Sequence, residues 1–339
     1  MNRSGLRLTA WIGTAMVAGS LTLSLLLLLI HYLPAQEFSP RLMAVAGMDG
    51  QLLLLCGGVA LFGAALMMGE IRKNPGSWFR YSAALLAVPW LAFFFVAHPI
   101  LSGWSEPKPK GSGAQLSLLV QNLWYRNEDP EALAQQLLAR NSQVMVLLEY
   151  TPAHAVAFKD AGALGQYQYR WELVEPYGHG IAVFSTIPFI NPQDLELSGS
   201  GVSMELQLPD SSVELFAVHF NAPTSVWDIP RWRSDFERAT AILEQAGPRT
   251  VVAGDLNADW GHIRFRQLLA QADLRDAQDV RSVGFATTWP ASAHFPTLLR
   301  LDHVLLGQGM ELNSFERLPR NSSDHRGLLA GLSLLEPAP

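Results

Sequence analysis

Hydrophobic residues are distributed unevenly along this chain of 339 residues, and the pattern changes near residue 105. Three long, almost uncharged stretches precede that point, at about residues 8–33, 51–69 and 81–101. About 20 consecutive apolar residues span the hydrocarbon core of a bilayer as a helix. The pattern therefore predicts a membrane domain over residues 1–104 with three transmembrane helices. A cleaved signal peptide is the rival interpretation of the first stretch, although its apolar run exceeds the usual core of about 7–15 residues.

The chain after the third stretch has a different pattern. Residues 105–114 contain prolines, glycines and lysines, which predicts a linker. From residue 115 to residue 339, short apolar runs of strand length alternate with polar turns and amphipathic segments. Two of these runs, at 116–120 and 144–148, enclose a helix-like segment, which indicates a strand–helix–strand crossover. Because later runs follow one another at hairpin spacing, we expect an α/β domain with a mixed sheet.

Charge is divided between the same two parts. The chain has a formal net charge of −6, but 27 of its 30 acidic and 18 of its 24 basic residues lie after residue 105, so that part carries about −9. This balance argues against a broad surface for duplex DNA. The remaining basic residues mostly precede the first apolar stretch or lie between the second and third. By the positive-inside rule, the N-terminus is expected in the cytoplasm of a multi-pass protein of an inner or plasma membrane, and the second domain outside the cytoplasm.

Cysteine adds nothing on the redox compartment, because the single Cys56 lies in an apolar stretch and excludes an intrachain disulfide. Polar side chains capable of chemistry are more informative, since they follow several predicted strands directly. If the strand of Asp255 continues to Asn257, the two side chains point the same way. Singly, each such residue also fits a turn, a solvated strand end or a packed core histidine. The whole set is Asn122, Glu149, His219, Asp255, Asn257, Asp302, Asp324 and His325.

In number and order these motifs resemble those of the endonuclease/exonuclease/phosphatase superfamily, which includes DNase I. The resemblance covers about residues 116–335 and leaves the membrane part outside. It implies a four-layer α/β sandwich, in which two packed mixed β-sheets are flanked by helices and catalytic groups gather at one end. The motifs that carry it are Gln121-Asn122, Leu147-Leu148-Glu149, Gly180-Ile181-Ala182-Val183-Phe184-Ser185, Val218-His219, Gly254-Asp255-Leu256-Asn257, Arg300-Leu301-Asp302-His303 and Ser323-Asp324-His325-Arg326.

The resemblance also implies a metal site. Glu149 matches the metal-binding glutamate of the superfamily, with Asn122 and Asp324 near the same cation or near the phosphate. Carboxylate and amide oxygens are ligands that Mg²⁺ prefers, and Mn²⁺ accepts a similar set. We therefore expect a Mg²⁺ cofactor, with Mn²⁺ as the alternative.

The other five residues match catalytic positions. Asp255 and Asn257 correspond to the pair that orients the phosphate and the nucleophile. Asp302 corresponds to the acid that hydrogen-bonds the terminal histidine, here His325. His219 matches the position that contacts the scissile phosphate as an acid or donor.

These expectations describe a membrane-anchored, metal-dependent phosphodiesterase or phosphatase. The short tether beside a lipid bilayer and the acidic charge favour a lipid headgroup or lipid-linked phosphate as substrate. An extracytoplasmic nuclease is the second enzymatic hypothesis, with nucleic acid as substrate. A third hypothesis is a non-catalytic membrane protein that binds phosphorylated ligands.

Overall fold

The computed structural model of the chain describes residues 3–71, 89–90, 92–93, 115–280, 285–291 and 296–335. The chain divides into two compact units. The first lies within residues 1–99 together with 261–263, and the second comprises residues 100–260 and 264–339. The predicted boundary between a membrane domain and a linker at residue 104 falls outside the described residues and stays a prediction.

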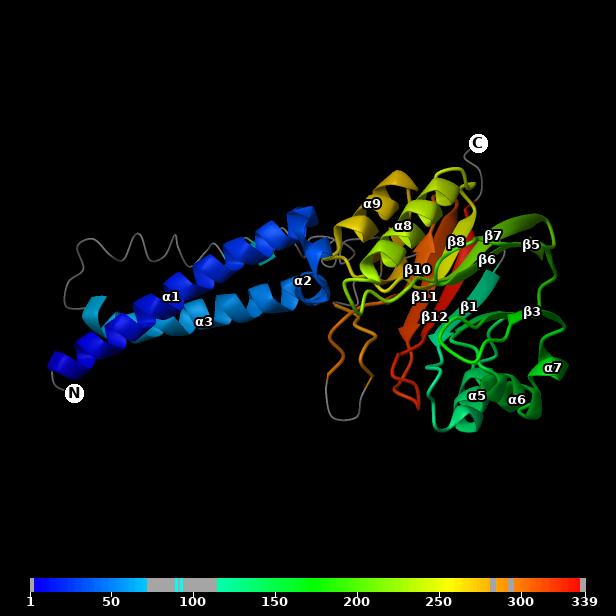
Figure 1. Cartoon of the computed structure of the whole chain (residues 1–339), viewed down its shortest axis with the longest axis horizontal. Helices are drawn as coiled ribbons and strands as arrows, with labels where there is room; N and C mark the ends of the chain where they lie inside the picture. The colour runs from blue at the N-terminus through cyan, green and yellow to red at the C-terminus, as the bar shows by residue number, and fades with distance from the viewer. Residues whose placement is uncertain are drawn as a thin grey trace. The chain divides into compact units, whose positions relative to one another are not determined.

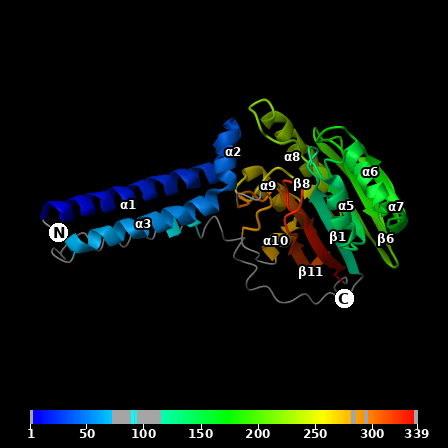
Figure 2. The same cartoon turned by 90° about the horizontal axis from the view of Figure 1, so that it is seen from below.

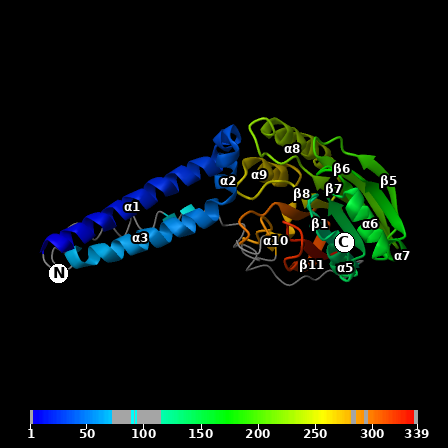
Figure 3. The same ribbon diagram turned by 60° about the horizontal axis from the view of Figure 1, so that its bottom comes forward.

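The first unit consists of helices. Its two long helices, α1 and α3, lie side by side (Figure 1, Figure 2 and Figure 3). Among the described residues, the segments Trp11–Tyr32 and Asp49–Met67 are long and apolar enough to cross a membrane. They coincide with the first two predicted spans, while the third, at 81–101, falls almost wholly outside the described residues. The elements are α1 (Arg3–Tyr32), the 3-10 helix η1 (Pro34–Phe38), α2 (Pro40–Gly47) and α3 (Asp49–Ile71).

Two glycines allow α1 and α3 to approach closely. A Cβ atom at Gly13 would lie 2.4 Å from the carbonyl oxygen of Gly63, and one at Gly63 would lie 2.8 Å from that of Gly13. Both distances are below any real contact of a Cβ atom. Small residues at such crossings let helix backbones pack directly in an apolar environment, where burial of apolar surface gives no driving force.

The second unit contains two six-stranded sheets. The first sheet consists of β11 (Met310–Arg317), β12 (Leu328–Leu334), β1 (Gln115–Asn122), β2 (Val144–Leu148), β4 (Ile181–Ser185) and β3 (Tyr169–Leu173), in this order. The second sheet consists of β5 (Phe189–Asp194), β6 (Ser200–Leu208), β7 (Ser211–His219), β8 (Thr250–Asp255), β10 (Asp302–Leu306) and β9 (Arg275–Asp276). Each sheet is mixed, because β1–β2 and β7–β8 are parallel pairs and the other neighbours are antiparallel.

The apolar faces of the two sheets form one continuous core. Val146 of β2, Leu118 of β1, Ala253 of β8 and Val304 of β10 are completely buried in it. Alternate residues of a strand point to opposite faces, so the intervening side chains of β1 and β2 pack instead against helices. The helices are α5 (Pro130–Leu138), α6 (Pro152–Asp160), α7 (Ala163–Gln166), α8 (Ile229–Leu243), α9 (Ile263–Gln271) and α10 (Ala277–Val280).

Helices cover both outer faces of this pair of sheets. Helices α5 and α6 pack on the first sheet, where Phe158 of α6 lies 5.7 Å from Phe184 of β4 between ring centroids. Helices α8 and α9 lie over the second sheet (Figure 1), and Phe265 of α9 contacts the ring of His303 in β10. The predicted four-layer α/β sandwich is therefore confirmed. The carboxyl ends of β1 and β2 in the first sheet and of β7 and β8 in the second lie at the same edge of the sandwich.

Candidate active site

All eight predicted site residues lie at that edge of the sandwich or in the loops beside it. From the first sheet come Asn122 at the end of β1, Glu149 directly after β2, and Asp324 and His325 shortly before β12. From the second sheet come His219 and Asp255, the last residues of β7 and β8, and Asp302, the first residue of β10. Because β10 runs antiparallel to β8, its start pairs with the end of β8, Asp302 opposite Asp255.

Asn122 connects the two sheets. Its Nδ2 donates to Glu149 Oε1 at 3.1 Å and to Asp255 Oδ2 at 3.1 Å, while its Oδ1 accepts from the backbone N–H of Trp124 at 2.9 Å. A carboxamide has two N–H donors, and both face carboxylates here. Asn122 therefore holds an acid from each sheet at a fixed separation.

Glu149 occupies an unusual backbone conformation. Its φ is +56°, a region that costs a non-glycine residue free energy of order 1–3 kcal/mol and is frequent at functional sites. The surrounding backbone fixes this turn, since Tyr150 N donates to Gly180 O at 3.0 Å. The carboxylate is held as well, because Tyr125 N donates to Glu149 Oε2 at 2.8 Å. Glu149 is thus presented at the mouth of the site in one orientation.

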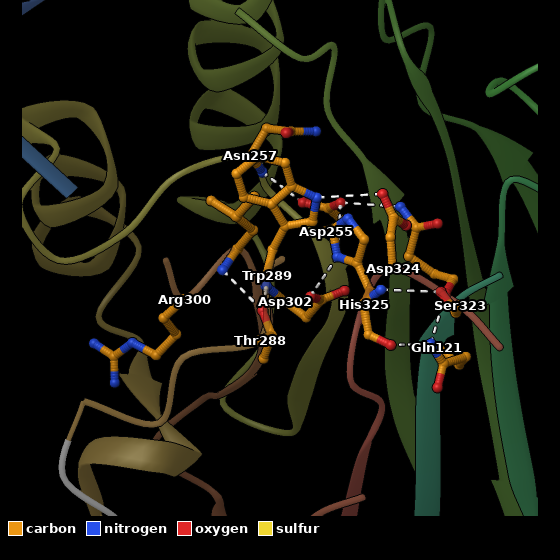
Figure 4. A network of polar contacts seen from close by, with 12 residues as sticks. Gln121, Asp255, Asn257, Thr288, Trp289, Arg300, Asp302, Ser323, Asp324 and His325 are labelled. Carbon is orange, nitrogen blue, oxygen red and sulfur yellow. Dashed lines mark hydrogen bonds and ion pairs between the residues drawn. The ribbon is translucent and has the colours of Figure 1, made fainter. Parts of the chain in front are cut away.

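Among the predicted site residues, His325 and Asp302 make the shortest contact between two side chains (Figure 4). Nδ1 of His325 lies 2.8 Å from Asp302 Oδ2 and 3.7 Å from Asp255 Oδ2. Burial alone would lower the pKa of His325, but the carboxylates of Asp302 and Asp255 outweigh it and raise the pKa to about 10. The ring is therefore an imidazolium that donates to Asp302 through Nδ1, which leaves Nε2–H as a second donor.

Backbone contacts fix the positions of both partners. The hydroxyl of Thr288 accepts from Asp302 N at 3.3 Å, and Ser323 Oγ accepts from His325 N at 3.0 Å. Gln121 Nε2 donates to His325 O at 3.1 Å (Figure 4). Thr288 and Ser323 are not among the predicted site residues, although Ser323 stands in one of the quoted motifs; both hydroxyls bind only backbone groups, so their roles depend on contacts that the sequence does not show.

His219 faces the carboxylates of both sheets. Its Nε2 lies 3.9 Å from Glu149 Oε1 and 3.9 Å from Asp255 Oδ2. Within the described part of the chain its buried Nδ1 has no hydrogen-bond partner. Burial and the charge of Asp302 raise the pKa of Asp255, which makes this carboxylate a better proton acceptor than an exposed one.

Asn257 is placed differently from the prediction. Strand β8 ends at Asp255, and Asn257 has φ +47°, so the two side chains do not share a strand face. Instead, Asn257 N donates to Asp255 Oδ1 at 2.8 Å, and its Nδ2 donates to Phe220 O at 2.9 Å. The expectation of parallel side chains is wrong because the carboxylate bonds its own backbone two residues on, which ends the strand in a turn. Asn257 therefore connects this turn to the loop after His219.

Asp324 lies beside a residue that the sequence did not identify. Trp289 Nε1 donates to Asp324 Oδ2 at 3.3 Å (Figure 4), and the other carboxylate oxygen is buried without a partner in the described part of the chain. Burial, reinforced by the charge of Glu149, raises the pKa of Asp324 despite the counter-charge of His325. The sequence signal for Trp289 was only a turn-like Thr-Thr-Trp-Pro stretch.

The chemistry of these side chains fits a hard divalent cation. Asp302 and Asp324 each have a buried carboxylate oxygen without a donor in the described part of the chain, and such oxygens are expensive unless a cation or proton satisfies them. One atom from each of Asp255, Asp302 and His325 lies within 4.8 Å of the others, a spacing compatible with a shared ion. Since Nδ1 of His325 carries a proton toward Asp302, however, Glu149 and Asp324 are better candidate ligands than this trio.

Three solved structures share the fold of the second unit at low sequence identity. An endonuclease/exonuclease/phosphatase family protein from Bacteroides thetaiotaomicron has 14% identity and a TM-score of 0.53, covering 67% of this chain and 100% of that chain. The catalytic domain of human nocturnin has 16% identity and a TM-score of 0.52, covering 66% of this chain and 96% of that chain. D. rerio TDP2 humanized by 14 mutations has 16% identity and a TM-score of 0.51, covering 65% of this chain and 99% of that chain.

The comparison with curated protein sequences found no match. A model of the Endonuclease/Exonuclease/phosphatase family matches residues 119–325, which is more than half of the chain and includes every predicted site residue. The convergence of these residues at one edge of a sandwich of two mixed sheets agrees with that match. The chain therefore belongs to the endonuclease/exonuclease/phosphatase family of phosphoester hydrolases.

Proposed function

We propose that this protein is a membrane-anchored phosphodiesterase or phosphatase that depends on Mg²⁺ or Mn²⁺. The observation that carries the proposal is the bridge made by Asn122, which holds Glu149 and Asp255 on either side of one amide nitrogen. The Asp302–His325 pair lies beside it, 3.7 Å from Asp255. Two acids, an imidazolium and a second histidine thus surround one position, the arrangement that hydrolysis of a phosphate anion requires.

The cation would be held by Glu149 and Asp324, with Asn122 orienting the former. When bound, it would neutralise charge on the phosphate oxygens and on the leaving oxygen. The raised pKa of Asp255 suits it to accept a proton from the attacking water. Nε2–H of His325 is free to donate to a phosphate oxygen, while Asp302 keeps the ring protonated and oriented.

His219 and Asn257 are proposed to act on the substrate side. His219 Nε2, at 3.9 Å from each of two carboxylates, can donate to a phosphate oxygen placed between them. Asn257 fixes the turn of Asp255 through its backbone N–H and holds the loop after His219 through Nδ2.

A lipid headgroup or lipid-linked phosphate is the substrate class we favour. The support is the pair of apolar helices in the same chain, which would keep the enzyme at a bilayer surface and raise the effective concentration of lipid substrates. From the distribution of basic residues we propose that the catalytic unit lies outside the cytoplasm, on the assumption of three spans. Protease accessibility of this unit in intact cells tests that orientation.

A nuclease is the alternative. The observation in its favour is the fold shared with D. rerio TDP2, one structure of which contains a single-strand DNA product and has 14% identity and a TM-score of 0.51. The acidic balance of this chain argues against tight binding of duplex nucleic acid. Because both functions would use the same site, only the substrate that is hydrolysed distinguishes them.

The decisive experiment is a phosphoester panel assayed with the purified full-length protein in detergent. It compares phospholipids, single- and double-stranded nucleic acid and bis-p-nitrophenyl phosphate, each with Mg²⁺, Mn²⁺ or excess chelator. We expect hydrolysis that the chelator abolishes, and a loss of at least about 10²-fold in Glu149→Ala and His325→Ala. Glu149→Gln keeps the side-chain volume and should lose activity equally.

The matched control is Tyr167→Phe. This change removes the bond from Tyr167 Oη to Ser142 O, 3.0 Å long and buried in the helical layer outside the first sheet. It should cost stability without reducing turnover. Wild-type-like turnover in Glu149→Gln, or hydrolysis that survives the chelator, would overturn the proposed metal-dependent mechanism.

A further inference from the structure

A second charged cluster lies behind the active site and is closed to solvent. His303 is 0% exposed, Arg300 is 1% exposed and Asp276 is 2% exposed. Removing such groups from water is costly, and the structure compensates only where each one finds a partner. Because no substrate can reach this cluster, its role must be exerted on the neighbouring backbone.

Both ring nitrogens of His303 face acceptors. Nδ1 lies 2.6 Å from Asp276 Oδ2, while Nε2 lies 2.9 Å from Ala258 O and 3.1 Å from Arg300 O. A carbonyl oxygen cannot donate, so Nε2 must carry a proton that is shared between the two carbonyls. The ring also packs against Phe265 of α9, with 4.4 Å between centroids.

The two carbonyls belong to the segments that carry the catalytic acids. Ala258 lies three residues after Asp255, and Arg300 lies two residues before Asp302. The same two segments are joined by a backbone bond from Leu256 N to Leu301 O at 3.0 Å. The Nε2–H of His303 thus closes the junction where Asp255 ends β8 and Asp302 begins β10.

The carboxylate of Asp276 favours the protonated form of His303. Burial alone would lower the pKa of His303, but the adjacent carboxylate of Asp276 outweighs it and raises the pKa. Arg300 lies 3.8 Å from the same carboxylate and donates to Asp279 Oδ1 at 2.6 Å, so the acids are shared between two cations. A charged donor makes a stronger hydrogen bond to a carbonyl than a neutral one.

From this geometry we infer that His303 is a positioning residue for hydrolysis: its Nε2–H holds the Asp255 turn against the segment that carries Asp302. The effect of His303 on turnover rests on the proposed function. Its structural content, a clamp between two backbone segments, can be measured without any substrate.

Two substitutions separate the clamp from the charge. In His303→Gln the amide nitrogen can reach the position of Nε2 and still donate to the two carbonyls. In His303→Asn the amide nitrogen lies near the position of Nδ1 and can reach only Asp276. Both variants lose the positive charge and the contact with Phe265, and they differ in whether the amide donates to the two carbonyls or to Asp276.

The first readout is amide hydrogen exchange of the full-length protein in detergent. We expect exchange at residues 255–259 and 300–302 to be roughly ten- to hundred-fold faster in His303→Asn than in His303→Gln, because two buried carbonyl oxygens lose their donor in the former. Exchange at the Glu149 turn of the other sheet should be unchanged. Equal exchange in the two variants, or acceleration spread over both sheets, would overturn the inference.

The second readout is kinetic. His303→Asn should lower kcat by on the order of 10²-fold through misplaced catalytic groups, with KM and the Mg²⁺ dependence close to wild type, and His303→Gln should recover most of this loss. A loss confined to KM would contradict a positioning role. If the wild-type protein hydrolyses none of the panel, the proposed function fails, and the exchange experiment still decides whether the clamp exists.

Discussion

A single histidine, His154, should lower the stability of the catalytic unit as the pH drops below neutrality. His154 is 1% exposed and occupies the third position of α6, where it forms a capping box with Thr151. Its Nδ1 lies 3.3 Å from Thr151 N, a donor, so this nitrogen must be unprotonated. Burial lowers the pKa of His154 to about 4.

The sign and size of the effect follow from this lowered pKa. Above pH 6.5 the histidine is neutral in both the folded and the unfolded chain and contributes nothing to the pH dependence. Between pH 6.5 and about pH 4 the unfolded chain binds a proton at His154 that the folded chain excludes, so the contribution of this residue to stability falls as the pH falls. At about 1.4 kcal/mol per pKa unit, the free energy of unfolding that is lost through His154 approaches about 3 kcal/mol below pH 4.

The comparison variant is His154→Gln, because glutamine also completes a capping box but does not titrate. Exchange of the most protected amides in β1 and β2 measures the free energy of unfolding of the catalytic unit. Between pH 6.5 and pH 4 this free energy should fall by roughly 3 kcal/mol less in the variant than in the wild type. Parallel profiles would refute the argument, since they would mean that His154 protonates equally in both states. The turn of Glu149 directly precedes α6, so loss of the Thr151–His154 capping box on protonation of His154 should also loosen that turn.

Two further predictions concern the acid beside the catalytic histidine and the helix crossing of the first unit. Asp302→Asn removes the charge that orients His325, so kcat should fall by on the order of 10²–10⁴-fold. The Mg²⁺ concentration for half-maximal activity should change little. A shift in that concentration alone would instead make Asp302 a metal ligand. Gly63→Leu places a side chain against the backbone of Gly13, so a cysteine pair that cross-links α1 to α3 in the wild-type background should cross-link poorly in this variant. Gly58→Leu is its control, because a Cβ at Gly58 meets nothing within 4 Å.

Buried strands were predictable because both of their faces are apolar. The run predicted at 144–148 is strand β2, Val144–Leu148, and all five of its residues are buried. Strands β5 and β11 were not predicted, since both lie at an edge of a sheet. Most side chains of β5 are exposed, and those of β11 alternate irregularly around a bulge. The buried face of β11 is limited to Met310 and Leu312 and that of β5 is absent, so neither strand has enough hydrophobic periodicity to detect.

The identities of Asn122, Glu149, His219 and Asp255 followed from their positions at the ends of buried strands, but the contacts of these residues did not. A turn after the buried strand was one of the alternatives that the sequence left open for Asn257, but the bond from its N–H to Asp255, which ends the strand there, could not be predicted. Trp289 was equally hidden, since its role depends on Asp324, which lies 35 residues further along the chain. Contacts between distant loops are set by the packing of the two sheets, and local pattern does not contain them.

That packing is also what creates the site. Asn122 of the first sheet bonds Asp255 of the second at 3.1 Å, and His325, preceding β12 of the first, bonds Asp302 of the second at 2.8 Å. Each sheet alone would present acids without their partners, and the like charges would repel one another. The contacts become favourable only when the apolar core between the sheets brings the two edges together. Polar pairing at the edge therefore depends on hydrophobic packing beneath it, so a core substitution that shifts one sheet should reduce turnover before it unfolds the domain.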